Sequence, residues 1–509
     1  MKHSFLPTWM PAAALALVLP LTFAACSDDN EPAQTEERHW TTNGGLKAAD
    51  NLLFEGNVIG NGDQEFVFTG RQTLKRGTYY LKGWVYVAEG AELIIEPGTI
   101  IRGDKQTKSA LIVERGGKLI AQGTAQAPIV FTSGEAKGQR KPGDWGGLIL
   151  CGRAPHNAGE AQIEGGPRAK HGGQDAADNS GVLSYVRVEF AGYPFETDKE
   201  INGITFGSVG SATKVDHVQV SYSNDDSFEW FGGNVDAKYL IAYKGWDDDF
   251  DTDNGYSGHV QYGLSVRDGR IADKSQSNGF ESDNDASGST ASPFTTATFS
   301  NMTFIGPRQT DGFVNTTDFI NGGDYFPSNG SGLGRFQAAM QIRRGSRLNC
   351  INSVAIGWPI GLILDGEKGN TQSQATAGAI TLQNLWLADC ELTGSDANKL
   401  YEDVLVTGYD ENKNPIKDAT KCSFSTSFFQ SQKGNRVATL AELALTGKDN
   451  QVGLYFNYFP SAGSPLLTAA SFTGASSFFD AVPYIGAFAP GNDWLNGWTN
   501  FDPNNTDYE

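Results

Sequence analysis

Carboxylates are concentrated in one part of the chain. The stretch GWDDDFDTDNG (245–255) places five aspartates in seven positions, and the stretches NDDSFEWFGG (224–233) and SNGFESDND (277–285) add further acids. Two like charges about 4 Å apart repel by roughly 1 kcal/mol in water, and by several times that near a protein surface. The acids therefore require either full hydration or a bound cation.

The acidic stretches share a phenylalanine. Phe228, Phe250 and Phe280, and after them Phe313 in TDGFV (310–314), follow one another at separations of 22, 30 and 33 residues. These are the lengths of single coils in a β-solenoid. The spacing predicts that the phenylalanines stack inward and that the acids, with Asp311 among them, face outward. Carboxylates of successive coils would then lie about 5 Å apart, as adjacent strands do.

This arrangement predicts a Ca²⁺ site assembled between coils, because Ca²⁺ prefers several oxygen ligands in an adaptable geometry. An EF-hand is excluded, since Asn254 stands where its loop needs glycine and Val260 where it needs the closing glutamate. A structural alternative stays open, in which the acids are solvated and accept backbone N–H bonds at turns. The predicted metal ligands are Asp225, Asp226, Glu229, Asp247, Asp248, Asp249, Asp251, Asp253, Glu281 and Asp283.

Aromatic residues border the acids. Trp230, Trp246 and Tyr256 could stack on sugar rings while carboxylates and amides bind the hydroxyl groups. The alternative is that they pack in the core, as tryptophans at solenoid turns also do. The sequence thus predicts a glycan or other polar molecule as the ligand.

Catalysis requires more than the acids. A Ca²⁺-dependent polysaccharide lyase needs a basic side chain to remove a proton, and the candidates are Arg267, Arg343 and Arg344. A glycoside hydrolase needs two carboxylates at a defined separation, and the acidic stretches offer too many to choose among. The chain carries no serine-hydrolase elbow, P-loop or HExxH motif. An enzyme, if present, would be a lyase or a hydrolase, but the sequence favours a binding protein.

The elements that position these residues repeat. VYVAEGAELIIEPG (85–98) and LIVERGGKLIAQGT (111–124) superpose at a shift of 26, which matches Val87 with Val113 and Leu93 with Leu119. Each half reads as a short alternating strand, a glycine corner and a second strand. This pattern is typical of one coil of a parallel solenoid.

A second strand type recurs farther along. It occurs in LSYVRVEFAG (183–192), VDHVQVSYS (215–223), AKYLIAYKG (237–245), HVQYGLSV (259–266), FSNMTFIG (299–306), LNCINSVAIG (348–357) and LQNLWLADC (382–390). Long helical patterns are missing between these strands, which argues against a βαβ sheet. We predict an all-β parallel β-helix over residues 51–394, with an antiparallel sandwich or barrel as the alternative.

Residues 395–509 lack the recurrent strand pattern of the preceding coils. VATLAELAL (437–445) is the best short helix, and loops rich in proline, glycine and aromatic residues follow it. A solenoid end must be covered, so this region is predicted to be a cap, with VPYIGAF and WLNGWTNFDP laid over the last coils. A small ligand-binding module is the alternative.

The N-terminus carries a targeting segment. The apolar run AAALALVLPLTF (12–23) ends in Ala24, Ala25 and Cys26, which resembles a bacterial lipoprotein signal over residues 1–25 with lipidation at Cys26. Ordinary secretion is the alternative. Residues 26–50 are polar and acidic and are predicted to be a flexible tether. The resemblance implies a lipid anchor in the outer membrane and exposure at the cell surface.

Charge and cysteine content exclude some functions. The formal net charge of −20 and pI of about 4.7 argue against nucleic acid as a partner. After Cys26 the chain has Cys151, Cys350, Cys390 and Cys422, none in a CxxC pair, which makes a zinc site unlikely on spacing alone. Disulfides and free thiols both remain open for these four.

Five stretches together resemble a known family. GWVYVAEGAELIIEPGTIIRG, GDWGGLILCGRAP, VDHVQVSYSNDDSFEWFGG, GWDDDFDTDNGYSG and GWTNFDP are similar to a family of Bacteroidetes surface lipoproteins. The resemblance implies a right-handed parallel β-helix of the pectin-lyase type and an association with outer-membrane uptake, including a TonB-dependent transporter as partner. Three functions follow as expectations: a surface protein that binds a glycan, a Ca²⁺-dependent lyase or hydrolase, and a structural or adhesive protein.

Overall fold

The structure is a computed structural model that describes residues 53–163, 168–196, 199–446 and 458–509. The predicted signal segment, Cys26 and the tether lie outside these residues. Among the helices that are described, none combines the length and apolarity needed to cross a membrane.

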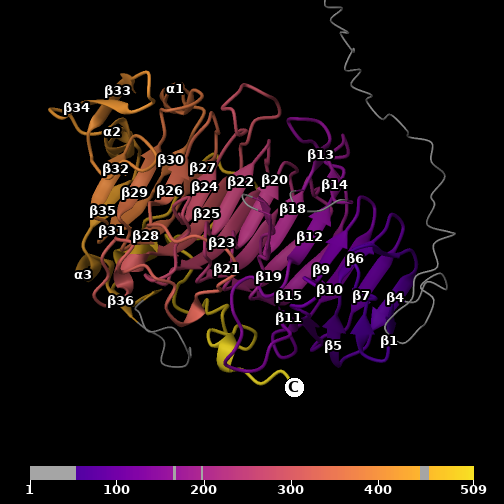
Figure 1. The fold of residues 1–509 in the computed structure, drawn as a ribbon. Coiled ribbons are helices and arrows are strands. Elements are labelled where there is room, and N and C mark those ends of the chain that lie inside the picture. The colour runs from indigo at the N-terminus through magenta and orange to yellow at the C-terminus, as the bar shows by residue number, and fades with distance from the viewer. Residues whose placement is uncertain (1–52, 164–167, 197–198, 447–457) are drawn as a thin grey trace, which may run out of the picture. The chain divides into compact units, whose positions relative to one another are not determined.

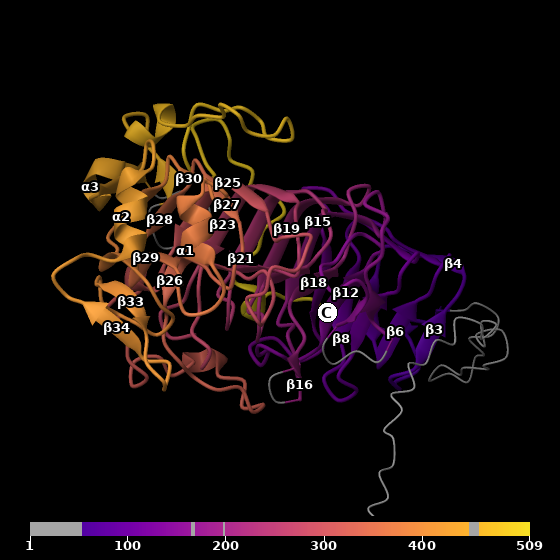
Figure 2. The same cartoon turned by 90° about the horizontal axis from the view of Figure 1, so that it is seen from above.

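One parallel sheet runs through the whole stack of coils (Figures 1 and 2). We call it the groove sheet, and within the described residues it has eleven strands. They are β3 (Phe66–Phe68), β6 (Trp84–Val87), β9 (Ala110–Val113), β12 (Gly147–Cys151), β18 (Ile204–Gly207), β20 (Phe228–Phe231), β22 (Phe250–Asp253), β24 (Phe280–Ser282), β26 (Ala338–Ile342), β29 (Ile360–Leu364) and β32 (Leu392–Ser395).

The second sheet has eighteen strands in the described part of the chain. They are β1 (Phe54–Glu55), β2 (Val58–Ile59), β4 (Arg71–Leu74), β5 (Thr78–Leu81), β7 (Glu92–Ile95), β8 (Ile100–Gly103), β10 (Lys118–Gln122), β11 (Ile129–Ser133), β15 (Gly181–Glu189), β19 (Lys214–Ser221), β21 (Ala237–Tyr243), β23 (His259–Val266), β25 (Thr298–Ile305), β27 (Asn349–Ile351), β28 (Val354–Ile356), β30 (Leu382–Gln383), β31 (Trp386–Ala388) and β35 (Arg436–Ala438). In the early and late coils this sheet is two short strands wide, and in the middle each pair fuses into one bent strand.

The register confirms the sequence repeat. Val87 pairs with Val113, and Leu93 pairs with Leu119, in parallel. The recurrent strands also stack in order, from β15 through β19, β21, β23 and β25. The parallel pairing of coil on coil excludes the sandwich and barrel alternatives, and the fold is a right-handed parallel β-helix.

A column of left-handed residues forms the bend between the two halves of the fused strands. Each member follows the previous one in register, and all have φ between 50° and 64°. The column consists of Tyr185, His217, Tyr239, Tyr262, Asn301, Asn352 and Asn384. The aromatic rings stack, with centroids 4.2 Å apart for Tyr185 and His217 and 4.4 Å for His217 and Tyr239. We call this set the corner column.

The C-terminal segment returns along the corner column. Trp494 and Trp498 pack on Tyr239 and His217, and Arg140 donates to the carbonyl of Pro503 at 2.6 Å. In Figure 1 the yellow chain end accordingly lies beside the purple coils. The prediction that WLNGWTNFDP lies over the last coils is therefore wrong. We call residues 458–509 the return segment.

The remaining elements lie in loops and at the end of the stack. The hairpins pair β13 (Ala161–Gln162) with β14 (Lys170–His171), β16 (Pro194–Glu196) with β17 (Lys199–Glu200), β33 (Leu405–Tyr409) with β34 (Pro415–Asp418), and β36 (Leu445–Thr446) with β37 (Phe459–Pro460). The helices are α1 (Thr371–Thr376), α2 (Phe424–Ser431), α3 (Leu440–Leu443) and the 3₁₀ turns η3 (Pro307–Gln309), η4 (Gly323–Tyr325), η5 (Pro465–Thr468) and η6 (Pro503–Asn505).

Two details of the C-terminal region differ from the sequence prediction. The expected helix over 437–445 shortens to α3, because Thr439 caps its start in a capping box with Glu442 and Ala444 ends it in a left-handed conformation. The β-helix also passes residue 394, since β35 pairs with β31 as a further rung. All four cysteines of the described chain are free thiols, two of them buried.

Candidate functional site

The acidic stretches meet at the groove sheet. Phe228 pairs with Phe250, and Phe250 pairs with Phe280, and all three side chains are fully buried in the core. The next rung is Met340 rather than Phe313, because an insertion between β25 and β26 carries Phe313 and Asp311 out of the sheet. The stacked ladder is confirmed for three coils and is wrong for the fourth.

Carboxylates form a row on the outer side of this ladder. Glu229 pairs with Asp251, and Asp251 pairs with Glu281. With Asp225, Asp226, Asp253 and Asp283 they line a pocket of about 210 Å³ that Arg343 and Arg344 close on one side. We call this pocket the acidic groove. The structure thus brings together seven of the ten predicted metal ligands and two of the three predicted basic residues.

Some of the predicted metal ligands also accept hydrogen bonds from the backbone. An oxygen of Asp226 accepts the N–H of Asp248 at 2.9 Å, and an oxygen of Asp248 accepts the N–H of Asn278. Asn278 accepts the N–H of Ala338 at 3.0 Å in turn. Each side chain thereby binds the next coil, which is the structural role that the sequence left open for these acids.

Asp249 and Arg267 do not belong to the groove. Their side chains are fully buried and form an ion pair at 2.7 Å, and Arg267 also donates to the carbonyl of Asp247 at 2.6 Å. The second oxygen of Asp249 accepts from Ser265, so the buried pair leaves no free base and no free metal ligand. The predictions of Asp249 as a metal ligand and of Arg267 as a catalytic base are therefore wrong.

Two groups of acids have the geometry for a cation. The carboxylate oxygens of Asp226, Glu229 and Asp251 lie within 4.8 Å of one another, and those of Asp225, Asp226 and Asp247 do the same. One buried oxygen of Asp251 and one of Asp247 has no hydrogen-bond donor among the described residues. A buried acceptor without a donor is costly, and hard cations take oxygen ligands of this kind. The residues present therefore fit a Ca²⁺ ion.

Burial and mutual repulsion raise the pKa values of these carboxyls. Burial raises the pKa of Asp253 to about 8, with Asp283 adding to the shift, and raises that of Asp248 to about 7. For Asp226 and Asp251, burial and the neighbouring carboxylates raise the pKa well above the usual range. Without a cation, part of the groove therefore keeps its protons at neutral pH.

The arginines of the groove are bound to its acids. Arg343 forms ion pairs with Glu281 and, at 2.9 Å, with Asp283, and Arg344 pairs with Asp283 at 2.5 Å. Asn202, which the sequence analysis missed, donates to Glu229. Asn202 lies just before β18, in a coil without an acidic stretch, so no motif marks it.

The predicted sugar platform does not exist. Trp230, Trp246 and Tyr256 are all fully buried. Trp230 stacks on Phe206 and Tyr256 inside the coils, and Trp246 donates to the carbonyl of Gly332 at 2.9 Å. These residues belong to the core, and no ring face is left for a ligand.

This chain belongs to the family described as the pectate-lyase-like β-helix domain, whose pattern it matches over residues 67–428. Among solved structures it is similar to the crystal structure of the pectate lyase Pel9A, with 14% identity and a TM-score of 0.35, over 79% of this chain and 88% of that one. None of the curated proteins compared with the chain matches it.

Proposed function

We propose that the acidic groove binds Ca²⁺ and that the ion and the two arginines together bind a glycan or another polar ligand. The observation that supports this most directly is the group of Asp226, Glu229 and Asp251, whose oxygens converge within 4.8 Å. A divalent cation there relieves the repulsion between the carboxylates and gives the unpartnered oxygen of Asp251 a ligand bond.

The size of the groove favours a ligand that enters with one edge. Pockets that enclose a small molecule have volumes of about 300–1,000 Å³, whereas the acidic groove has about 210 Å³. A carboxylate or a pair of hydroxyl groups on a longer chain fits this space between the ion and Arg344. The larger part of such a chain would lie outside on the coil edges.

The test is a thermal melt with Ca²⁺ and with chelator, on the wild type and on Asp251→Asn. A ligand at a hundredfold excess over its Kd stabilises the folded state by about 2.7 kcal/mol, so Ca²⁺ should raise the Tm of the wild type. Asp251→Asn keeps the side-chain shape and removes the charge, and it should abolish most of the rise.

The matched control is Asp311→Asn. Asp311 is exposed and lies outside the ladder, so this variant should respond to Ca²⁺ as the wild type does. A wild-type Tm that does not change with Ca²⁺ contradicts the metal proposal. A Ca²⁺ response without binding of any glycan supports a structural or adhesive role instead.

A polysaccharide lyase is the second candidate. Arg343 and Arg344 also line a smaller adjoining pocket that contains Lys368, and a lysine next to a cation site is a suitable proton acceptor. The arginines suit this role less, because burial lowers the pKa of Arg343 but the carboxylates of Glu281 and Asp283 outweigh it and raise that pKa well above its usual range. Absorbance of unsaturated products from uronate polymers would support the lyase, and binding without turnover supports the binding protein.

We also propose lipid attachment at Cys26, with the protein held in the outer membrane and exposed at the surface. The support is the apolar segment that ends in Ala24, Ala25 and Cys26. A TonB-dependent transporter is the proposed partner for uptake. Labelling with a palmitate analogue should mark the wild type and fail for Cys26→Ser, and loss of labelling should be accompanied by loss of the transporter on co-purification.

A further inference from the structure

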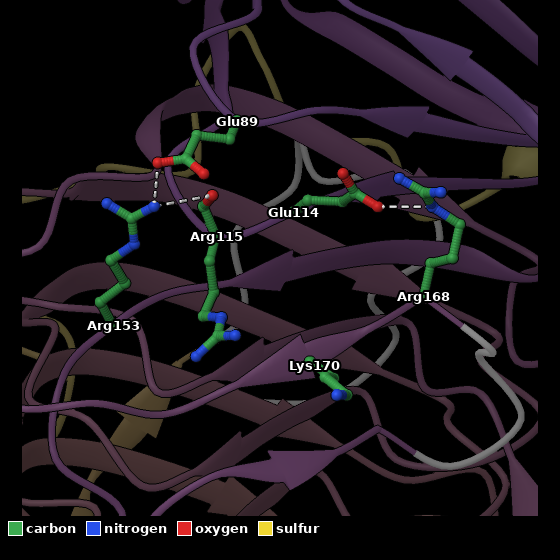
Figure 3. A pocket seen from close by; sticks show the side chains of 6 residues that line it. All are labelled: Glu89, Glu114, Arg115, Arg153, Arg168 and Lys170. Carbon is green, nitrogen blue, oxygen red and sulfur yellow. Dashed lines mark hydrogen bonds and ion pairs between the residues drawn. The ribbon is translucent and has the colours of Figure 1, made fainter. Parts of the chain in front are cut away.

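A second pocket, of about 550 Å³, lies along the edge of the groove sheet in the early coils (Figure 3). Glu89, Glu114, Arg115 and Arg153 come from the turns directly after β6, β9 and β12. Since these strands pair in register, the turns stack at about 5 Å per coil. Its other two lining side chains come from the loop that contains β13 and β14, and they are Arg168 and Lys170.

Two described residues of the loop that carries these cations pack on the groove sheet. Ile163 and Ala169 are buried with Trp84 and Ile112 on the outer face of the groove sheet. The Arg168 guanidinium lies 5.5 Å above the ring of Tyr86 and donates to Glu114 at 2.7 Å. These contacts position the Arg168 guanidinium at the edge of the hydrophobic cluster.

The pocket carries positive charge in a strongly acidic protein. Four cationic side chains line it together with two carboxylates, and the third carboxylate in reach is Glu160, which pairs with Arg115. Among the described residues that line the pocket, cationic side chains therefore outnumber carboxylates, in a chain whose net charge is −20. In Figure 3 Arg115 and Lys170 lie between the pair of Arg153 with Glu89 and the pair of Arg168 with Glu114.

An incoming anion can replace the glutamates that now pair with Arg153 and Arg115. Glu89 and Glu160 have side chains that are 72% and 61% exposed, and exposed pairs of this kind contribute only about 0–1 kcal/mol. Each guanidinium has several N–H donors, of which Arg153 uses only Nη2 and Arg115 only Nη1 within the described chain. Lys170 is exposed, and its ammonium lies near enough to Glu160 to help lower the pKa of that carboxyl, after the larger effect of Arg115.

We propose that this pocket is a separate binding site that takes the sulfate or carboxylate group of a sugar directly on Arg115, Arg153 and Lys170, without a metal ion. Guanidinium groups bind such planar or tetrahedral oxyanions through paired N–H bonds, and the volume admits one or two sugar rings. The site goes beyond the proposed function, because it shares no residue with the acidic groove. Ile163, on the same loop, lines the groove instead.

Calorimetry with chondroitin disaccharides tests the proposal. The 6-sulfated disaccharide supplies a sulfate and a carboxylate, the unsulfated one supplies the carboxylate alone, and lactose is the neutral comparison. The full chain should bind one or both charged sugars in the presence of EDTA and should not bind lactose. Whichever charged sugar binds more tightly identifies the oxyanion, and the affinity should fall as salt increases.

The variant Arg153→Gln/Lys170→Gln should reduce this affinity at least about tenfold, because it removes two of the three donor groups. Lys170 is exposed and the Arg153 side chain is 41% exposed, so folding should be preserved. The matched control is Arg76→Gln/Lys137→Gln, which removes the same charge from exposed positions elsewhere and should bind as the wild type does.

Three results overturn the proposal: no binding of either charged sugar by the wild type, equal loss in both double variants, or binding that disappears in EDTA. The last would place the sugar at the acidic groove. Because Ca²⁺ is absent from the supporting experiment, failure here leaves the Ca²⁺ melt as an independent measurement of the groove.

Discussion

The neighbours of each carboxyl determine its protonation in the acidic groove and just beside it. Asp248, Asp249 and Asp253 lie within one short stretch, and burial raises all three pKa values, to about 7, about 6 and about 8. Asp249 is raised least because Arg267 stabilises its charged form. Asp253 is raised most because Asp283 faces it. Charge at this site is therefore decided by individual contacts.

These shifts predict a pH dependence of stability. A carboxyl with a raised pKa keeps its proton in the folded state at a pH where the unfolded chain, with a pKa of about 4, has lost it. Folding then takes up protons, so the stability of the cation-free protein should fall as pH rises from about 4 through about 8, the pKa of Asp253 in the folded state. Denaturant unfolding in chelator at a series of pH values checks this.

Calcium should restore the stability that the cation-free protein loses as the pH rises. The ion competes with the retained protons, so its stabilising effect should be larger at about pH 8 than at about pH 5. Binding near neutral pH should release protons, which calorimetry in two buffers of different ionisation enthalpy measures. Equal Tm shifts at both pH values would contradict the assignment of these carboxyls as ligands.

Part of the groove could be predicted from residue spacing, and part could not. The coil-length steps between Phe228, Phe250 and Phe280 predict both the stack and the outward acids, and the register confirms the stack. The same rule places Trp230 inward, because alternate residues of a strand share a face and Trp230 follows Phe228 by two. The pairing of Asp249 with Arg267 could not be predicted, since it depends on which side chain enters the core at a turn.

At the scale of the elements, the corner column stacks the bend of each middle coil on the bend of the next coil. Tyrosine and histidine occupy its first four positions, and asparagine occupies the last three. Left-handed backbone costs about 1–2 kcal/mol for most residues but less for asparagine. Asn352 also binds Ser471 and accepts from Asn384 at 3.0 Å. The column thus connects the coils to the return segment.

Substitutions of Asn352 should separate the contribution of its side-chain hydrogen bonds from that of its left-handed backbone conformation. Asn352→Gly removes the buried hydrogen bonds but tolerates the left-handed conformation, with an expected loss of about 1–3 kcal/mol in the free energy of unfolding. Asn352→Val removes both and should lose about 1–2 kcal/mol more. Equal losses in the two variants would show that backbone conformation contributes nothing at this corner.

The strands could be predicted well because their alternation is local. The recurrent segments from 183 to 390 correspond to β15 through β31, and the strand order follows from the repeat. Helix α2, the longest helix described, could not be predicted, because FSTSFFQS has no long apolar period and depends on Asp396 and Asp403, which bind its first turn.

At the scale of the molecule, the return segment connects the last coil to much earlier ones. Arg187 donates to the carbonyl of Trp498 at 2.9 Å and to Tyr508 at 3.2 Å. Tyr508 donates to Glu189 at 2.8 Å. These contacts join residues more than 300 positions apart, which is why sequence patterns could predict a cover but not where it lies.

The variant Trp498→Ala should therefore destabilise the whole β-helix. Trp498 is fully buried against the corner column, and loss of a buried tryptophan side chain costs about 3–5 kcal/mol. A marked fall in Tm by differential scanning calorimetry is the expected result. Phe326→Ala, at an aromatic that is 37% exposed, is the comparison and should change the Tm much less.

The return segment also has a consequence for biosynthesis. Ribosomes make the chain from the N-terminus, so the coils with Tyr185, His217 and Tyr239 can form while the residues that cover them have not yet been made. Until the final tryptophans emerge, each nascent molecule presents a continuous aromatic stripe that nascent-chain chaperones recognise. A premature stop codon ahead of Trp494 would remove both tryptophans and leave that stripe permanently exposed, with aggregation as the outcome.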